Sequence, residues 1–175
     1  LAAALFRAGL TSALVLSLAL APGAPPALAQ RAQATAPAPL KVEATASTAN
    51  GFARIIFNLN QIVSSEVKIS GGVLVVAFGQ PVEVQQLNLL VSQLDGYVTA
   101  VRSDPDGRSL RFALSRRVTV NSMEAGERLF VDMLPDRWPG PPPGLPADVV
   151  EELTRRARDA ERRARAAELA RAGSA

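Results

Sequence analysis

The fold is indicated most directly by one alternating stretch, Arg108-Ser109-Leu110-Arg111-Phe112-Ala113-Leu114. Leucine and phenylalanine occupy every second position, so one side of an extended chain is apolar and the other carries serine, arginine and alanine. This pattern predicts a half-buried β-strand. The stretch follows Asp104-Pro105-Asp106-Gly107, in which proline and glycine favour a tight turn. We therefore expect residues 98–103 to pair with the strand across that turn.

An earlier part of the chain repeats this pattern without a gap. An offset of 55 residues places Phe57 on Phe112. The same offset also matches Leu59 with Leu114, Val63 with Val118, Gly71 with Gly126, Leu74 with Leu129 and Val76 with Val131. Each copy contains an alternating strand, a second strand, a glycine turn and a third apolar strand. The match predicts a mainly β fold, a small two-sheet sandwich built from a duplicated three-stranded unit.

The remaining strand and helix signals fit this scheme. Residues 73–78 are apolar on both faces, which predicts a central strand, and Gly71-Gly72 provides a hairpin turn before it. Residues 118–123 and 128–134 form a second expected pair around a glycine turn. Between the copies, residues 84–94 carry apolar side chains at helical spacing. A short helix is expected there, with an irregular crossover as the alternative.

Residues 1–29 have the pattern of a cleaved signal peptide. Arg7 precedes an apolar run over residues 10–21, and Ala27-Leu28-Ala29 forms a small-x-small cleavage site. The apolar run is short for a membrane span and is followed by several prolines. We therefore expect an exported, periplasmic protein with no stable membrane span after cleavage, beginning with a flexible linker over residues 30–39.

The remaining residues divide into a β domain over 40–135, a proline-rich linker over 136–146 and a charged α-helix over 147–172. The linker has a polyproline composition, and we expect Trp138 to cap the core. The PxxP spacing of the linker also resembles ligands of aromatic-groove modules.

The helix has acidic and arginine side chains four residues apart. It also has a narrow apolar seam, formed by Val150, Leu153, Ala157, Ala160, Ala164 and Ala167. The seam is too weak for a stable dimer, which predicts a solvated spacer or the start of a longer helical region.

The composition argues against several kinds of chemistry. The sequence contains no cysteine and no histidine, so disulfides, acylation on cysteine and the commonest metal ligand and general base are excluded. No serine lies in a nucleophile motif, and no phosphate loop is present. We expect no enzyme activity, no cofactor and no metal. The net charge is +3 with both signs interspersed, so nucleic acid is not an expected partner.

Arginines in the β region are the remaining polar signal, because guanidinium groups bind carboxylates through two parallel hydrogen bonds. The candidate ligand-binding residues are Arg54, Arg111, Arg116, Arg117 and Arg128. Solvated strand edges would give the same pattern. Asp132 follows Arg128 by four positions on the same strand face, which predicts either a structural ion pair or an exposed polar pair. Asp104 and Asp106 are explained by their turn.

Two motifs resemble a known family. Gly51-Phe52-Ala53-Arg54-Ile55-Ile56-Phe57-Asn58-Leu59 and Gly126-Glu127-Arg128-Leu129-Phe130-Val131-Asp132-Met133-Leu134 resemble the opening and closing motifs of the AMIN domain, a small β module of bacterial envelope proteins. More broadly, residues 51–166 resemble the N-terminal part of large periplasmic tetratricopeptide-repeat proteins of alphaproteobacteria. The resemblance implies a two-sheet sandwich that localises proteins to peptidoglycan or to envelope machines. No amidase, secretin or helical-repeat region accompanies it, so a truncated gene, a fragment or a shortened relative is expected.

These observations lead to two functional hypotheses. In the first, the chain is a non-catalytic envelope module that binds peptidoglycan or an envelope protein and localises a larger assembly. In the second, it is a structural adaptor whose C-terminal helix pairs with another protein, either by itself or as a fragment of a tetratricopeptide-repeat scaffold.

Overall fold

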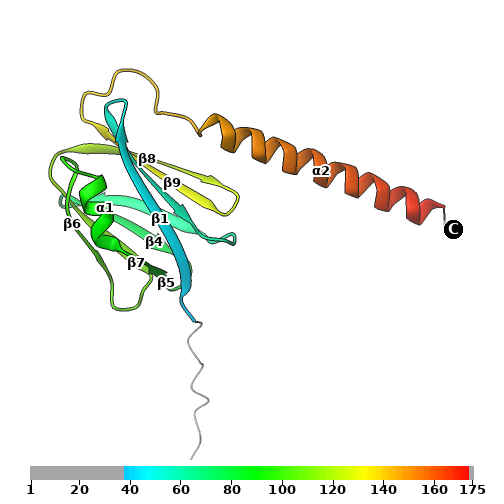
Figure 1. The fold of residues 1–175 in the computed structure, drawn as a ribbon, viewed down its shortest axis with the longest axis horizontal. Coiled ribbons are helices and arrows are strands. Elements are labelled where there is room, and N and C mark those ends of the chain that lie inside the picture. Colours follow the sequence, from blue (N-terminus) through cyan, green and yellow to red (C-terminus); the bar gives the residue numbers. More distant parts are fainter. Residues whose placement is uncertain (1–37, 174–175) are drawn as a thin grey trace, which may run out of the picture. The chain divides into compact units, whose positions relative to one another are not determined.

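The computed structural model describes residues 38–173 (Figure 1). The predicted signal peptide and most of the linker that follows it lie outside this range. The described strands and helices are β1 (Leu40–Ala49), β2 (Phe52–Asn58), β3 (Ser65–Ser70), β4 (Val73–Phe78), β5 (Val82–Val84), α1 (Leu87–Gln93), β6 (Val98–Ser103), β7 (Ser109–Leu114), β8 (Val118–Ala125), β9 (Arg128–Pro135) and α2 (Ala147–Ala172).

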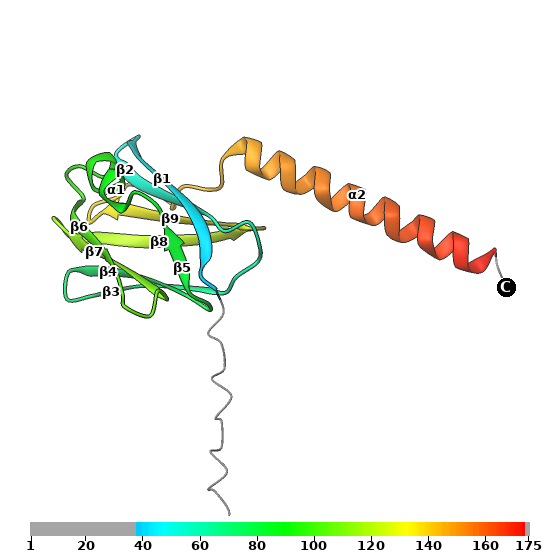
Figure 2. The same ribbon diagram turned by 60° about the horizontal axis from the view of Figure 1, so that its bottom comes forward.

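The strands form two layered sheets, which Figure 2 shows one above the other. One sheet has five strands in the order β5-β1-β2-β9-β8, and the other has four in the order β3-β4-β7-β6. Alternating side chains from both sheets meet in a shared core, in which Phe57, Leu74, Phe112 and Val131 are fully buried. The predicted fold class, a mainly β two-sheet sandwich followed by a C-terminal helix, is confirmed.

The sequence repeat corresponds to an exchange of strands between the two sheets. In β2 and β9, Phe57 lies opposite Leu129, and in β7 and β4, Phe112 lies opposite Leu74. The offset that maps Phe57 onto Phe112 also maps Leu74 onto Leu129. The first strand of each copy therefore pairs with the third strand of the other copy, so each copy completes the sheet of its counterpart.

The predicted hairpins and the short helix are all present, but two strands were missed. β1 pairs with β2 through a turn at Asn50 and Gly51, both of which have positive φ angles. Its inward residues include small alanines, such as Ala44 and Ala46, so its alternation is weak. β5 is only three residues long and pairs with the start of β1.

A second, smaller core covers the outer face of the five-stranded sheet. Phe130 of β9 and Ala125 of β8 contact Val149 of α2, and Ile56, Met123, Leu145 and Leu153 complete the cluster. The proline-rich linker and the first turns of α2 therefore pack on the β domain. Neither described helix combines the length and apolar character that crossing a membrane requires.

The shared core yields the first prediction. Phe112→Ala should lower the free energy of unfolding by about 3–5 kcal/mol, because it removes a fully buried ring and leaves a cavity. Phe57→Ala should cost a similar amount, since Phe57 occupies the equivalent position. Urea unfolding measures both losses. Ile62→Ala is the control, because Ile62 is 84% exposed. Losses below about 1 kcal/mol at both phenylalanines would contradict their placement in the core.

Candidate functional site

Arg54 and Asp132 form a buried ion pair on the outer face of the five-stranded sheet. They lie opposite each other on β2 and β9. The Arg54 Nε and Nη2 atoms donate hydrogen bonds of 2.6 and 2.8 Å to the two Asp132 carboxylate oxygens. Asp132 is completely buried, and the Arg54 side chain is 12% exposed. Nη2 also donates to the Gly144 carbonyl oxygen at 2.9 Å, so one guanidinium connects two strands and the proline-rich linker.

Aromatic rings surround this ion pair. The Arg54 guanidinium lies 5.4 Å from the Phe52 ring centroid and 5.6 Å from that of Phe130. Trp138 contacts Phe52 edge to face at 5.6 Å, and its indole N–H donates to the Pro141 carbonyl oxygen. The rings limit solvent access to the pair. Trp138 lies on this outer face, beside the linker it belongs to.

The geometry corrects two expectations. Arg54 is not an exposed arginine, because its side chain is already bonded to Asp132 and Gly144. Asp132 and Arg128 form neither the ion pair nor the exposed polar pair that their spacing predicted, because Asp132 is completely buried and bonds Arg54. Positions i and i+4 of a strand share a face but lie about 13 Å apart, whereas cross-strand neighbours lie within about 5.5 Å. Arg128 instead pairs with Glu152 of α2.

Charged side chains hold the first turns of α2 against the β8–β9 hairpin. Arg156 bonds Glu127 at 2.9 Å and Glu152 at 2.5 Å, and Glu152 also accepts a hydrogen bond from Arg128. The Arg128 bond lowers the pKa of the Glu152 carboxyl below its usual range. The Arg156 bond lowers the pKa of Glu127 in the same way. Arg128 therefore has a structural role in this network.

The outer face of the four-stranded sheet is the opposite surface of the sandwich. The strand registers place Lys68, Val75, Arg111 and Arg102 in one row across β3, β4, β7 and β6. Three of these four residues are cationic. Lys68 and Arg111 are 57% and 40% exposed, and Arg102 is also exposed. We call this row the cation row.

A shallow hollow of about 270 Å³ lies beside the cation row. Its lining contains the apolar residues Val73, Ala100, Val101 and Ala113 together with Arg102 and Arg111. Asp104 accepts two hydrogen bonds from Arg111, of 2.7 and 2.8 Å. These bonds lower the pKa of Asp104 and hold the Arg111 guanidinium at the edge of the hollow. The arrangement suits a ligand that has a carboxylate beside a small apolar group.

The last two predicted arginines lie near the β7–β8 connection. The Arg116 guanidinium stacks on the Tyr97 ring at 4.9 Å, and the Tyr97 hydroxyl donates to the Gly51 carbonyl oxygen. Arg117 is exposed. The five predicted arginines therefore occupy three different regions, and Arg111 alone belongs to the cation row. Lys68 and Arg102 were missed because only strand register brings them beside Arg111.

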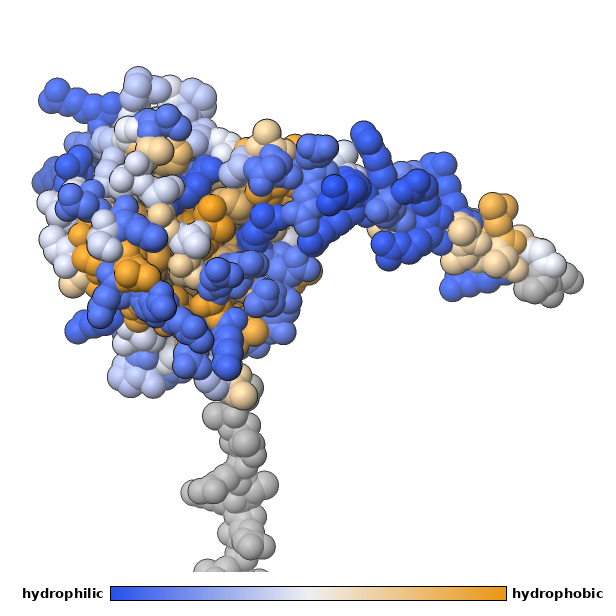
Figure 3. Space-filling view, viewed as in Figure 1, coloured by the Kyte–Doolittle hydropathy of each residue, from blue (hydrophilic) through white to orange (hydrophobic). Residues whose placement is uncertain are grey.

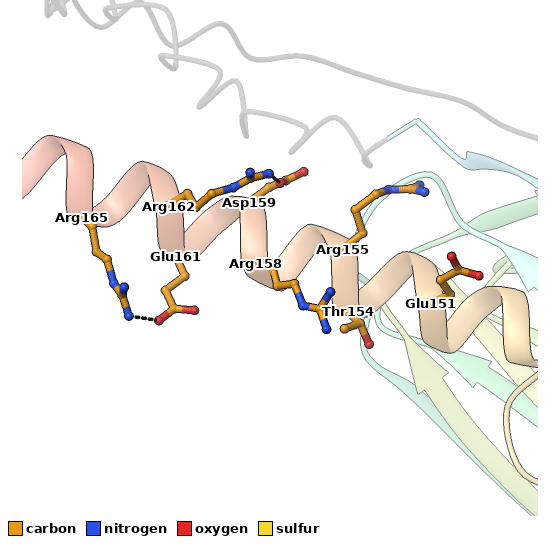
Figure 4. A pocket seen from close by; sticks show the side chains of 8 residues that line it. All are labelled: Glu151, Thr154, Arg155, Arg158, Asp159, Glu161, Arg162 and Arg165. Atoms are coloured by element: carbon orange, nitrogen blue, oxygen red, sulfur yellow. Dashed lines mark hydrogen bonds and ion pairs between the residues drawn. The ribbon is translucent and has the colours of Figure 1, made fainter.

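α2 presents a second basic surface. Arg155, Arg158, Arg162 and Arg165 lie three and four residues apart along the helix, and in Figure 4 Arg155 and Arg162 point upward whereas Arg158 and Arg165 point downward. Arg162 pairs with Asp159 and Arg165 with Glu161, whereas Arg155 and Arg158 have no ion pair among residues 38–173. Four acidic and arginine pairs stand four residues apart on α2. Glu152–Arg156 and Glu161–Arg165 form ion pairs, whereas Asp159 bonds Arg162 in place of Arg163, and Glu151–Arg155 forms no ion pair in the described part of the chain.

The predicted apolar seam of α2 is displaced by one residue where the helix begins. Val149 is buried against the sheet, and Val150 is 48% exposed. The seam alanines beyond Leu153 are all exposed. Figure 3 shows that the surface of α2 is hydrophilic along most of its length and apolar near its C-terminal end, where Leu169 is 73% exposed.

Within residues 38–173, no three acidic side chains converge as a metal site would require. No family model matches this chain, and no curated protein is significantly similar to it.

The buried ion pair yields the second prediction. Arg54→Met should destabilise the protein by about 3–5 kcal/mol, because it leaves the Asp132 carboxylate buried without its partner. Replacing both residues, Arg54→Met with Asp132→Leu, should recover much of this loss, since apolar side chains tolerate burial. Urea unfolding of the single and double variants measures the coupling. Arg117→Met is the exposed control. An Arg54→Met loss no larger than that of the control would contradict a structural role for the pair.

The third prediction concerns acid. The folded-state pKa values of Glu152 and Glu127 lie below their ordinary value of 4.5. Their contribution to helix packing is therefore complete above about pH 4.5 and is lost as the pH falls through the folded-state values. Fluorescence of Trp138, the only tryptophan, should report looser packing of the linker in acid. Glu152→Gln should reduce this acid dependence, and Glu151→Gln should not. Equal acid responses in both variants would contradict the assignment.

Proposed function

We propose that this chain is a non-catalytic module of the bacterial cell envelope that binds carboxylate-bearing groups on the outer face of its four-stranded sheet. The ligand is peptidoglycan, whose stem peptides carry carboxylates and small methyl groups, or an envelope protein with similar groups. The proposed location is the periplasm, which is based on the signal-peptide pattern of residues 1–29.

The observation that carries this proposal is the contrast between the two outer faces of the sandwich. The linker and α2 pack on the outer face of the five-stranded sheet, and its arginines are bonded within the chain. The opposite face presents the cation row beside an apolar hollow. Arg102 there has no ion pair within the described residues, so its guanidinium is available to a carboxylate.

The chemistry of the hollow supports the same ligand class. Arg111 binds the Asp104 carboxylate through two parallel hydrogen bonds, which is the geometry that a ligand carboxylate would use when it competes with Asp104. Val73, Ala100 and Ala113 offer contact for a methyl-sized group. The AMIN resemblance agrees with this proposal, because that family localises proteins at the cell wall.

The fourth prediction tests the cation row by sedimentation of the full chain with purified sacculi. Arg102→Gln with Arg111→Gln should weaken binding at least tenfold at low salt, because each charge-assisted bond contributes about 1.5–3 kcal/mol. Asp104→Asn should strengthen binding, since it removes the anion that competes for Arg111. These variants break the same ion pair but change binding in opposite directions, which separates loss of a ligand contact from loss of fold.

Two controls complete this experiment. Binding should fall as salt rises from about 0.1 to 1 M, where the Debye length shrinks from about 10 to 3 Å. Arg155→Gln with Arg158→Gln changes an equal number of arginines on α2 and should leave sedimentation unchanged. If the α2 variant alone loses binding, the β domain is not the binding surface.

The alternative function is a structural adaptor that acts through α2. One observation favours it: α2 is exposed from Thr154 to its end except at Asp159, with an arginine face and a separate alanine seam. A helix with these two faces is suited to pairing with an acidic partner helix. In that case the Arg155 and Arg158 variants should lose a protein partner while the β-domain variants keep it.

A further inference from the structure

A row of arginines runs along the exposed part of α2. Arg155, Arg158, Arg162 and Arg165 stand three or four residues apart, and Leu169 continues the same spacing. With 3.6 residues per turn, all five positions fall within an arc of about 80° around the helix axis. Figure 4 shows the four arginine side chains splayed to both sides of this arc. We call the four arginines together with Leu169 the arginine row.

No described part of the β domain covers the arginine row. The contacts that hold α2 on the β domain end with Leu153 and Arg156. From Thr154 to Ala172, every residue except Asp159 is exposed. This part of the helix gains nothing from tertiary packing, which supplies most of the stability of helices in proteins. It is therefore a surface that an external partner can cover.

The exposed part of α2 is strongly basic. Thr154 to Ala172 contains seven arginines and three acidic residues, a net charge of +4. Two arginines of the row bond Asp159 and Glu161. Arg155 and Arg158 have no ion pair within residues 38–173. Charge complementarity therefore favours an anionic partner.

The neighbours of the arginine row favour a membrane surface over a partner helix. Helix pairing requires an apolar seam, and the side chains beside the row, Glu151, Thr154, Asp159 and Glu161, are polar. Burying arginines in a protein interface also requires that each one is desolvated and paired. The headgroup layer of a bilayer is hydrated, so arginines can bond lipid phosphates there while they stay in contact with water.

Leu169 adds the apolar contact that strengthens binding to lipid. Its side chain is 73% exposed and lies on the same surface as Arg165 and Ala172. Figure 3 shows this apolar patch at the C-terminal end of an otherwise hydrophilic helix. An apolar side chain in line with arginines can enter the acyl boundary while the long arginine side chains reach the headgroups.

We propose that the arginine row docks α2 on a membrane surface rich in anionic phospholipids, with the helix lying in the headgroup layer and Leu169 inserted below it. Binding at such a surface strengthens with each cation near it, and clusters of about four to eight basic residues on a helix are typical of this interaction. The site is separate from the cation row and does not depend on it, because different elements carry the two surfaces.

The test measures sedimentation of the full chain with lipid vesicles at low salt. Vesicles of equal parts phosphatidylglycerol and phosphatidylcholine should bind the chain, and vesicles of phosphatidylcholine alone should bind it far less. Arg155→Gln with Arg158→Gln should weaken binding to the anionic vesicles about tenfold or more. Arg117→Gln with Arg137→Gln is the matched control, because it removes the same charge from exposed positions outside α2. Leu169→Ala should weaken binding about threefold without changing the charge.

A second readout reports which side of the helix meets the lipid. The chain has no cysteine, so Leu169→Cys and Ala167→Cys each accept a single environment-sensitive dye. Positions two residues apart lie on nearly opposite sides of an α-helix. With anionic vesicles, the dye at position 169 should become brighter and shift to shorter wavelength, and the dye at position 167 should change little.

Three results would overturn the proposal. Equal losses of binding in the two double variants would mean that overall charge, not the arginine row, attracts the vesicles. Equal responses of the two dyes would mean that α2 does not lie on this side. No preference for anionic vesicles would exclude the lipid surface and leave the row to an acidic protein. All variants share residues 1–37, and glutamine is a good helix former, so these differences report on α2 itself; circular dichroism checks that the helix is retained.

Discussion

The ion pair between Arg54 and Asp132 is the contact on which the covered side of the molecule depends. Burying a carboxylate is costly unless it is paired and hydrogen-bonded, and Arg54 supplies two bonds to it from the neighbouring strand. The remaining bonding capacity of the same guanidinium reaches the Gly144 carbonyl oxygen. The arginine that neutralises the buried Asp132 therefore also holds the linker in place. The linker leads directly into α2, whose Val149 is buried.

This arrangement divides the two outer faces by role. On the five-stranded sheet, arginines form ion pairs with acidic residues of the same chain: Arg54 with Asp132, Arg128 with Glu152 and Arg156 with Glu127. On the four-stranded sheet, Arg111 bonds a turn residue and stays 40% exposed, and Arg102 is exposed beside it. Arginine content alone therefore does not identify a binding surface. What distinguishes the two faces is how far their cations are exposed: the Arg54 and Arg128 side chains are 12% and 26% exposed, whereas Arg111 and Lys68 stay 40% and 57% exposed although they pair with Asp104 and Glu66.

Sequence patterns predicted the core well because a strand's alternation depends on local residues. Phe57 and Phe112 were placed correctly by their period and by the repeat, and the hairpins followed from glycine turns. The ion-pair partners were not predictable in this way. Arg54 and Asp132 are 78 residues apart in sequence and meet only through strand register. The repeat contained information about this ion pair, because the strand register that places Phe57 opposite Leu129 also places Arg54 opposite Asp132. β1 was missed because alanine and threonine give little contrast between its faces.

Salt should affect the two outer faces of the β domain differently. The Arg54 side chain is 12% exposed and its partner Asp132 is completely buried, so salt screens this ion pair little. The Arg111 side chain is 40% exposed, so salt screens its interactions with a bound anion strongly. Under the proposed function, high salt should therefore release a carboxylate-bearing ligand from the cation row without opening the ion pair that holds the linker. Binding and packing respond separately to salt because the arginines that serve them differ in burial.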